Sequence, residues 1–135
     1  MNIEQARDVA LSMPFATEDE FYPQWISYRI DGKWFMLIQL DAPEPRVAVK
    51  LPPVDNIELR ARYNAIRPAY HMNHTHWSDL YLNGDLSDTM IGQLIRRSYA
   101  LVASKLPKSS VHYGDIHSVA LEELALTLDE IEKVK

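Results

Sequence analysis

The sequence predicts an α+β domain in which helices cover one face of an antiparallel β-sheet. Residues 26–30 and 36–40 alternate between apolar and polar side chains around an Asp-Gly pair, a pattern typical of a β-hairpin. Apolar residues recur at helical spacing in residues 3–13 and 88–106, on either side of this region. Helices and strands that follow one another in this order favour an antiparallel sheet with the helices on one side.

The N-terminal part of the chain is predicted to contain a helix, a loop and the hairpin. Asn2 can cap the helix, because its side chain can accept a hydrogen bond from a backbone N–H that lacks a partner. Pro14 ends the helical pattern. Residues 15–24 are acidic and follow no apolar period, so we expect a connecting loop there. The hairpin turn falls at Asp31-Gly32, since a two-residue turn of this type needs positive φ angles.

The middle of the chain is predicted to add a third strand, a short helix and a fourth strand. Residues 46–51 alternate as the hairpin does, and Pro52-Pro53 ends the run. Asp55 can cap a helix that ends near Asn64. Residues 79–82 alternate again, which indicates the fourth strand.

The C-terminal part is predicted to be helical. Ser87 can open a long helix that Leu106-Pro107 closes, so we expect residues 1–107 to form one domain. Residues 108–117 are polar and are interpreted as a linker. Residues 118–135 are expected to form a last helix, whose apolar stripe packs on the domain or on a partner.

The composition excludes several classes of protein. A chain of 135 residues has the length of one domain, and no apolar run approaches the roughly 20 residues that a membrane helix needs. There is no cysteine, which excludes disulfides, thiolate nucleophiles and sulfur-ligated metal centres. The N-terminus is amphipathic and unlike a secretory signal, so we expect a cytoplasmic protein. We find no glycine-rich phosphate loop and no paired acid and base, and therefore expect neither a cofactor nor an enzyme.

The alternation also predicts the two faces of the sheet. The face toward the helices is expected to carry Ile26, Tyr28, Ile30, Met36, Ile38, Leu40, Val47, Val49 and Leu51. The open face is then expected to carry Ser27, Arg29, Phe35, Leu37, Gln39, Arg46, Ala48 and Lys50. An antiparallel sheet with one uncovered face offers such a surface to a partner.

Charge is distributed unevenly along the chain. The net charge is −5, yet residues 46–76 hold five basic against two acidic residues. One hypothesis is that the open face binds DNA weakly, and that salt weakens this binding by counterion release. The residues expected to make the contacts are Arg29, Lys33, Arg46 and Lys50. The alternative is a protein-interaction surface, formed with the C-terminal helix, that binds another protein or a second copy of the chain.

A histidine-rich segment carries a third hypothesis. His71, His74 and His76 could offer imidazole nitrogens to a metal ion or help bind a small ligand, although we expect no metal there. Tyr70, Met72, Asn73 and Trp77 could line a small pocket. The structural interpretation, which we favour, is that these aromatic and polar residues lock the segment against the long helix, with Asn73 satisfying buried backbone groups.

Residues 68–77, Pro-Ala-Tyr-His-Met-Asn-His-Thr-His-Trp, resemble the signature of the MmcQ/YjbR family, and we call them the signature segment. The matching residues are Tyr70, His71, Met72, Asn73, His76 and Trp77, with Ala69 in place of the usual glycine. Asp85 to Asp88 and Ser98 to Val102 resemble the family's long helix. The resemblance implies a fold similar to frataxin and CyaY, or a double-wing arrangement of hairpins, and a DNA-binding role.

Overall fold

The structure is a computed structural model that describes residues 1–117 and 125–134. Its elements, in chain order, are α1 (Ile3–Leu11), β1 (Thr17–Tyr22), β2 (Trp25–Ile30), β3 (Lys33–Gln39), β4 (Arg46–Lys50), α2 (Pro53–Arg62), β5 (Ile66–Pro68), β6 (Trp77–Tyr81), α3 (Asp88–Ser104), α4 (Tyr113–His117) and α6 (Leu128–Val134). The predicted α+β class is confirmed. Among the described residues, no helix combines the length and the apolar character that crossing a bilayer requires.

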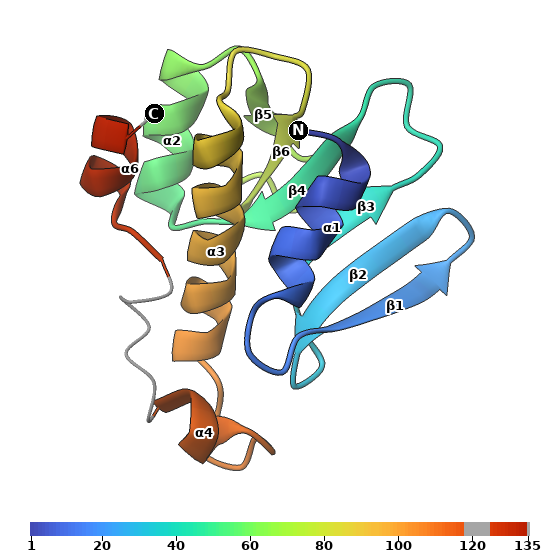
Figure 1. Ribbon diagram of the computed structural model, residues 1–135, viewed down its shortest axis with the longest axis vertical. Coiled ribbons are helices and arrows are strands. Elements are labelled where there is room, and N and C mark those ends of the chain that lie inside the picture. The colour runs from blue at the N-terminus through green and yellow to red at the C-terminus, as the bar shows by residue number, and fades with distance from the viewer. Residues whose placement is uncertain (118–124, 135) are drawn as a thin grey trace.

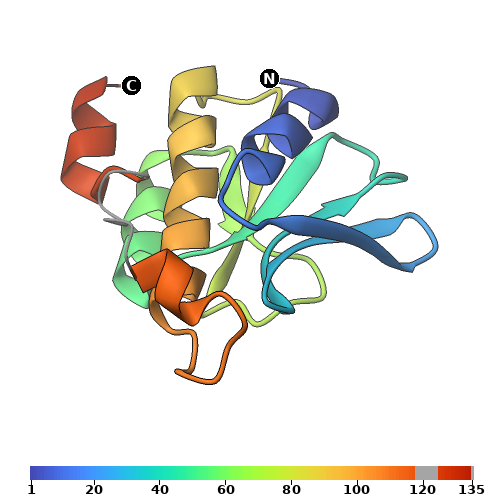
Figure 2. The same cartoon turned by 60° about the horizontal axis from the view of Figure 1, so that its bottom comes forward.

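The six strands form one antiparallel sheet in the order β1-β2-β3-β4-β6-β5. Helices α1 and α3 lie side by side across one face, and the β1–β2 hairpin extends beyond them (Figure 1). The same view turned by 60° shows both helices on this one side of the strands (Figure 2). The main hydrophobic core fills the space between these helices and the sheet.

The helix ends follow the predictions at two of three positions. Asn2 caps α1 and forms a reciprocal capping box with Gln5. Ser87 caps α3 by accepting the Met90 N–H. The prediction for Asp55 is wrong, because α2 begins at Pro53 and Asp55 lies within its first turn. The carboxylate of Asp55 is buried and pairs with Arg97 at 2.7 Å.

The segment predicted as a loop over residues 15–24 contains β1, an edge strand that sequence alternation could not reveal. Every residue of β1 is exposed, so neither of its faces needs an apolar period. Backbone pairing to β2 and ion pairs on both faces hold the strand. Arg7 on α1 binds Glu18 through two bonds of 2.8 Å, and Arg29 on β2 binds Asp19 at 3.0 Å.

The β2–β3 hairpin turns at Asp31 and Gly32 as predicted, with φ angles of 48° and 78°. A bulge then interrupts the pairing, because Tyr28 faces Met36 whereas Arg29 faces Trp34. Phe35 is the extra residue, and its ring points into the main core beside Tyr99, 5.3 Å between centroids. The prediction that Phe35 lies on the open face is therefore wrong. Leu40, predicted to be inside, lies beyond β3 and is exposed.

Ser98 joins α3 to the sheet at this bulge. Its hydroxyl donates to the Phe35 carbonyl and accepts the Lys50 N–H at 2.8 Å. The pairing of β3 with β4 stops at Met36 and Val49, and the buried hydroxyl bonds to the two backbone groups just beyond this point. The long helix is thereby fixed against two neighbouring strands.

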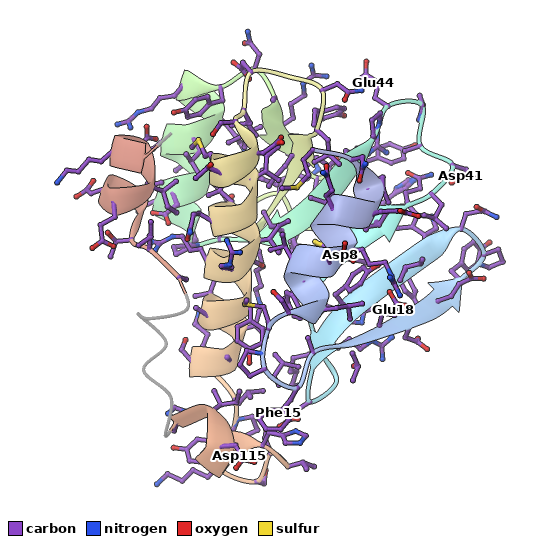
Figure 3. The ribbon with its side chains drawn as sticks, in the orientation of Figure 1. Asp8, Phe15, Glu18, Asp41, Glu44 and Asp115 are labelled. Atoms are coloured by element: carbon purple, nitrogen blue, oxygen red, sulfur yellow. The ribbon has the colours of Figure 1, made fainter. Side chains whose placement is uncertain are left out.

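The C-terminal region packs on the domain. The predicted linker at residues 108–117 contains α4, whose Ile116 is fully buried in the core. His112 donates its backbone N–H to Asp31 at 2.8 Å, and its ring stacks on Phe15. Figure 3 shows Phe15 next to α4. The predicted helix over residues 118–135 lies partly outside the described residues. Within the described part, α6 covers Leu128–Val134 with Leu128 and Ile131 buried, whereas residues 125–127 are not helical.

The position of Phe35 can be tested by mutation. We expect Phe35→Ala to lower the free energy of unfolding by about 3–5 kcal/mol, because it leaves a cavity in the core. Tyr22→Ala is the control, and since Tyr22 is 65% exposed its cost should stay near about 0.5 kcal/mol. Urea denaturation followed by tryptophan fluorescence measures both. Equal, small losses would mean that Phe35 faces solvent.

Candidate functional site

The sheet face turned away from α1 and α3 carries a second hydrophobic cluster. Its buried members are Leu37, Ala48, Ala69 and Trp77, and Trp25, Trp34 and Met72 pack against them half-buried. None of these residues comes from a helix. The open face is therefore strongly apolar at its centre, and the signature segment contributes three of the seven side chains.

The signature segment forms a closed loop across this face, between β5 and β6. Ala69 donates its N–H to the Trp77 carbonyl, and Trp77 donates to the Asn73 carbonyl at 2.9 Å. Asn73 also accepts the Thr75 N–H on its side chain. His71 adopts a φ of 63°, which turns the chain at the tip of the loop. Ala69 has no positive φ, so the residue that replaces glycine needs no special backbone.

Helix α2 holds the signature segment in place. Arg60 donates to the carbonyls of His74 and Trp77, at 2.6 and 2.8 Å, and to the Ser78 hydroxyl at 3.0 Å. Asn56 donates to the Thr75 carbonyl at 3.0 Å and accepts from Ser78. These bonds come from α2 rather than from the long helix that was predicted to hold the segment. Asn73, predicted to satisfy buried backbone groups, is exposed and accepts the Thr75 N–H.

An apolar depression, which we call the aromatic groove, lies between the signature segment and the β1–β2 hairpin. Its volume is about 290 Å³, and its lining residues are Phe21, Tyr22, Trp25, Trp34, Leu37, Tyr70, His71 and Met72. Phe21 contacts Trp34 with ring centroids 4.7 Å apart. Tyr22 and Tyr70, at opposite walls, are 65% and 55% exposed. The groove therefore offers aromatic surface to a partner.

The sequence did not identify the hairpin wall of this groove. Phe21 and Tyr22 belong to the stretch predicted as a loop. The bulge pairs Trp34 with Arg29 and so places its ring on the open face. The available signal was the density of aromatic residues around Pro23, where Phe21, Tyr22 and Trp25 fall within five positions. Aromatic residues near a turn can mark a binding surface as well as a core.

The four cations predicted to contact DNA differ in their surroundings. Arg29 pairs with Asp19 at 3.0 Å and lies over the Trp34 ring. Arg46 contacts Asp79 at 3.6 Å, donates to Gln39 and lies over the rings of Tyr70 and Tyr81. Lys33 and Lys50 instead line a second depression of about 220 Å³. The structure does not gather the four residues on one face, because Lys33 pairs with Ile30 of the helix-covered face whereas Arg29 pairs with Trp34 on the open face. Of the four, only the two lysines have no carboxylate partner among the described residues.

The histidines of the signature segment point to no metal centre. The His71 ring contacts the Tyr70 ring at an angle of 45°, with centroids 3.9 Å apart, and the His74 carbonyl accepts a bond from Arg60. Within residues 1–117 and 125–134, no three His, Cys, Asp or Glu side chains gather closely enough to hold a metal ion. We therefore place the candidate site in the aromatic groove.

Asp79 is a buried carboxyl group under the signature segment. Its side chain accepts the Tyr70 N–H at 3.1 Å. Burial raises the pKa of Asp79, although the Tyr70 N–H and the Arg46 guanidinium act in the opposite direction. The ionised carboxylate therefore costs free energy in the folded protein.

The role of Arg60 gives a prediction. We expect Arg60→Gln to lower the free energy of unfolding by about 1.5–3 kcal/mol, because charged hydrogen bonds to the carbonyls of His74 and Trp77 are lost. Amide hydrogens of residues 70–76 should also exchange faster. Glu58→Gln, an exposed change on the same helix, is the control. Hydrogen exchange that stays unchanged in this segment would contradict the role assigned to Arg60.

The raised pKa of Asp79 gives a second prediction. The folded state binds the Asp79 proton more tightly than the unfolded state does, so protonation of Asp79 stabilises the fold. This contribution is fully present below the unfolded pKa of 3.8 and is lost as the pH rises through the higher pKa of the folded state. Asp79→Asn should therefore gain stability relative to the wild type between pH 4 and pH 7. Urea denaturation at both pH values checks this, with the exposed Asp41→Asn as control. A relative stability that falls with pH would reverse the assigned sign.

Comparisons with known proteins agree with this architecture. A solved structure from Deinococcus radiodurans, of a protein with the DUF419 domain, matches with a TM-score of 0.77 and 24% identity, over 86% of this chain and 88% of that one. A Pseudomonas syringae protein matches with a TM-score of 0.62 and 30% identity, over 75% of this chain and 98% of its own.

Sequence comparisons extend the similarity to curated proteins. The Escherichia coli protein YbdF is 33% identical over 106 residues, which are 78% of this chain and 87% of YbdF. The Escherichia coli protein YjbR is 28% identical over 110 residues, 80% of this chain and 92% of YjbR. Both are described as uncharacterized. The family model YjbR matches residues 11–101, a range that contains both walls of the aromatic groove, and the chain belongs to the YjbR family.

Proposed function

We propose that this chain is a non-enzymatic binding protein whose open sheet face takes a large apolar side chain from a segment of a partner protein. The observation that carries the proposal is the aromatic groove, with Tyr22 and Tyr70 more than half exposed on its two walls. Exposed apolar surface is costly in water, and aromatic residues and methionine are enriched at the centres of protein interfaces. The rings of Trp25 and Trp34 are already held by packing, so a partner loses little entropy in ordering them.

A protein segment suits the groove better than a small molecule. Small-ligand sites usually combine an apolar lining with a few polar groups that fix the ligand's orientation. The groove lining contains no Asp, Glu, Lys or Arg, and its polar groups are confined to the His71 ring, two tyrosine hydroxyls and the indole N–H groups. A partner protein can obtain its specificity from contacts outside the groove, which a small molecule cannot reach.

DNA binding through the four predicted cations is less well supported. Arg29 and Arg46 are engaged with Asp19 and Asp79, and a phosphate would compete with these carboxylates. Strand β1 beside the groove also carries three consecutive acidic residues, Glu18 to Glu20, which would repel a polyanion.

Self-association through the predicted surfaces is also less well supported. The apolar stripe of the C-terminal helix is used within the chain, because Leu128 and Ile131 are buried in its own core. Pairing of β1 with β1 of a second copy would place the acidic residues of both strands together, which is unfavourable.

Selection of random phage-displayed peptides on the immobilised protein tests the proposal. We expect enriched peptides to share one aromatic or long aliphatic residue. The Tyr22→Ser/Tyr70→Ser variant should bind a selected peptide at least about tenfold more weakly, as loss of interface hot spots does. Fluorescence anisotropy measures the dissociation constants.

Val54→Ser/Ile57→Ser is the matched control, because it removes two exposed apolar side chains, 65% and 70% exposed, from α2. This control should bind as the wild type does. Equal weakening by both variants would contradict the proposal. Light scattering measures the oligomeric state of the wild type and of both variants. If the wild type and the control are dimers and the groove variant is a monomer, the occupant of the groove is a second copy of the chain.

A further inference from the structure

We infer that a second depression on this protein, which we call the lysine cleft, binds a small organic anion that carries a phosphate or carboxylate on an apolar body. The cleft lies where the C-terminal half of α3 passes the start of β3 and the end of β4. Lys33, Lys50 and Lys105 line it, together with Trp34, Trp77 and an aliphatic wall from α3. It shares only Trp34 with the aromatic groove, so the inference does not depend on the function proposed above.

The charged side chains that line the cleft are all positive. Its lining contains three lysines and no carboxylate. None of the three ammonium groups forms an ion pair with another described residue. Three like charges around one small depression repel one another, and a bound anion would relieve that repulsion. Arg29 and Arg46, the two cations of the open face predicted to bind DNA, differ from these lysines because each already has a carboxylate partner.

The three lysines come from separate elements of the fold. Lys33 begins β3, Lys50 ends β4, and Lys105 is the C-cap residue of α3. Ser98 fixes this arrangement, because its hydroxyl binds the backbone N–H of Lys50 and so ties α3 to the end of β4. The directions from which the ammonium groups approach are therefore set by the packed core, and the charged group of a ligand would meet them at the mouth of the cleft.

The apolar residues of the lining favour a ligand that also carries an apolar group. Trp77 is 8% exposed and packs in the hydrophobic cluster of the open face, and Trp34 is half-buried beside it. Leu101 and Val102 complete the opposite wall. A free inorganic anion would leave these surfaces in water, whereas a ring or short aliphatic group would cover them. The volume of about 220 Å³ suits a body the size of a single ring.

Phenyl phosphate, benzoate, phenol and inorganic phosphate are the probes that test the inference. We expect phenyl phosphate or benzoate, or both, to bind with a change in tryptophan fluorescence. Phenol and inorganic phosphate should each bind at least about fivefold more weakly, because each lacks one half of the ligand. The order of phenyl phosphate and benzoate distinguishes a phosphate from a carboxylate ligand.

Lys50→Gln/Lys105→Gln should weaken binding of the better probe at least about tenfold, since two of three charges are lost. Lys108→Gln/Lys133→Gln removes the same charge outside the cleft and is the matched control. Urea denaturation verifies that each variant is folded, and Lys33→Gln gives an independent measurement if the first variant is unstable. The Tyr22→Ser/Tyr70→Ser variant should bind the probe unchanged, which separates this site from the aromatic groove.

Two results would overturn the inference. The first is an equal loss of probe affinity in the cleft variant and in the control variant, which would indicate general charge attraction. The second is binding of a ten-residue oligothymidylate far more tightly than phenyl phosphate, with a steep loss in added salt, which would identify the cleft as part of a nucleic-acid surface.

Discussion

The guanidinium of Arg60 is the contact on which the candidate site depends. It donates to two carbonyls of the signature segment and to Ser78, so one side chain of α2 joins this loop to the rest of the domain. Burial lowers the pKa of Arg60, yet an arginine in a protein stays charged and keeps its full set of donors. The loop is thereby held as one wall of the aromatic groove, and the open face acquires its shape.

The apolar side chains of the two sheet faces are covered in different ways. On one face, α1 and α3 bury a continuous core, and Ser98 fixes the register between helix and strands. On the other face, three tryptophans gather without any helix above them, and the signature segment covers only part of that cluster. The uncovered remainder lines the groove, and Trp34 and Trp77 also line the cleft, whose other wall comes from α3. Incomplete coverage of an apolar face thus accounts for the groove, whereas the cleft forms where the ends of β3 and β4 meet α3.

Local signals predicted much of the fold, and their failures have identifiable causes. The hairpin turn, the caps at Asn2 and Ser87 and the inward alternation of most strand residues were all predicted, because each depends on neighbours in sequence. Strand β1 was missed, since an edge strand exposed on both faces needs no apolar period. Phe35 was assigned to the wrong face, because one bulge reverses the alternation and leaves no clear mark in the sequence.

The sequence by itself determined the α+β class, the family resemblance and the chemical character of the signature segment. Only the tertiary structure decided which of these side chains meet. Arg29 and Arg46 find Asp19 and Asp79, whereas Lys33 and Lys50 are joined by Lys105, a residue that no sequence pattern connected with them. Phe21 and Tyr22 reach Tyr70 across nearly fifty positions of the chain. Pairing of charges and closure of a groove depend on distances in space, and those are set by strand order, by the bulge and by the bonds from α2.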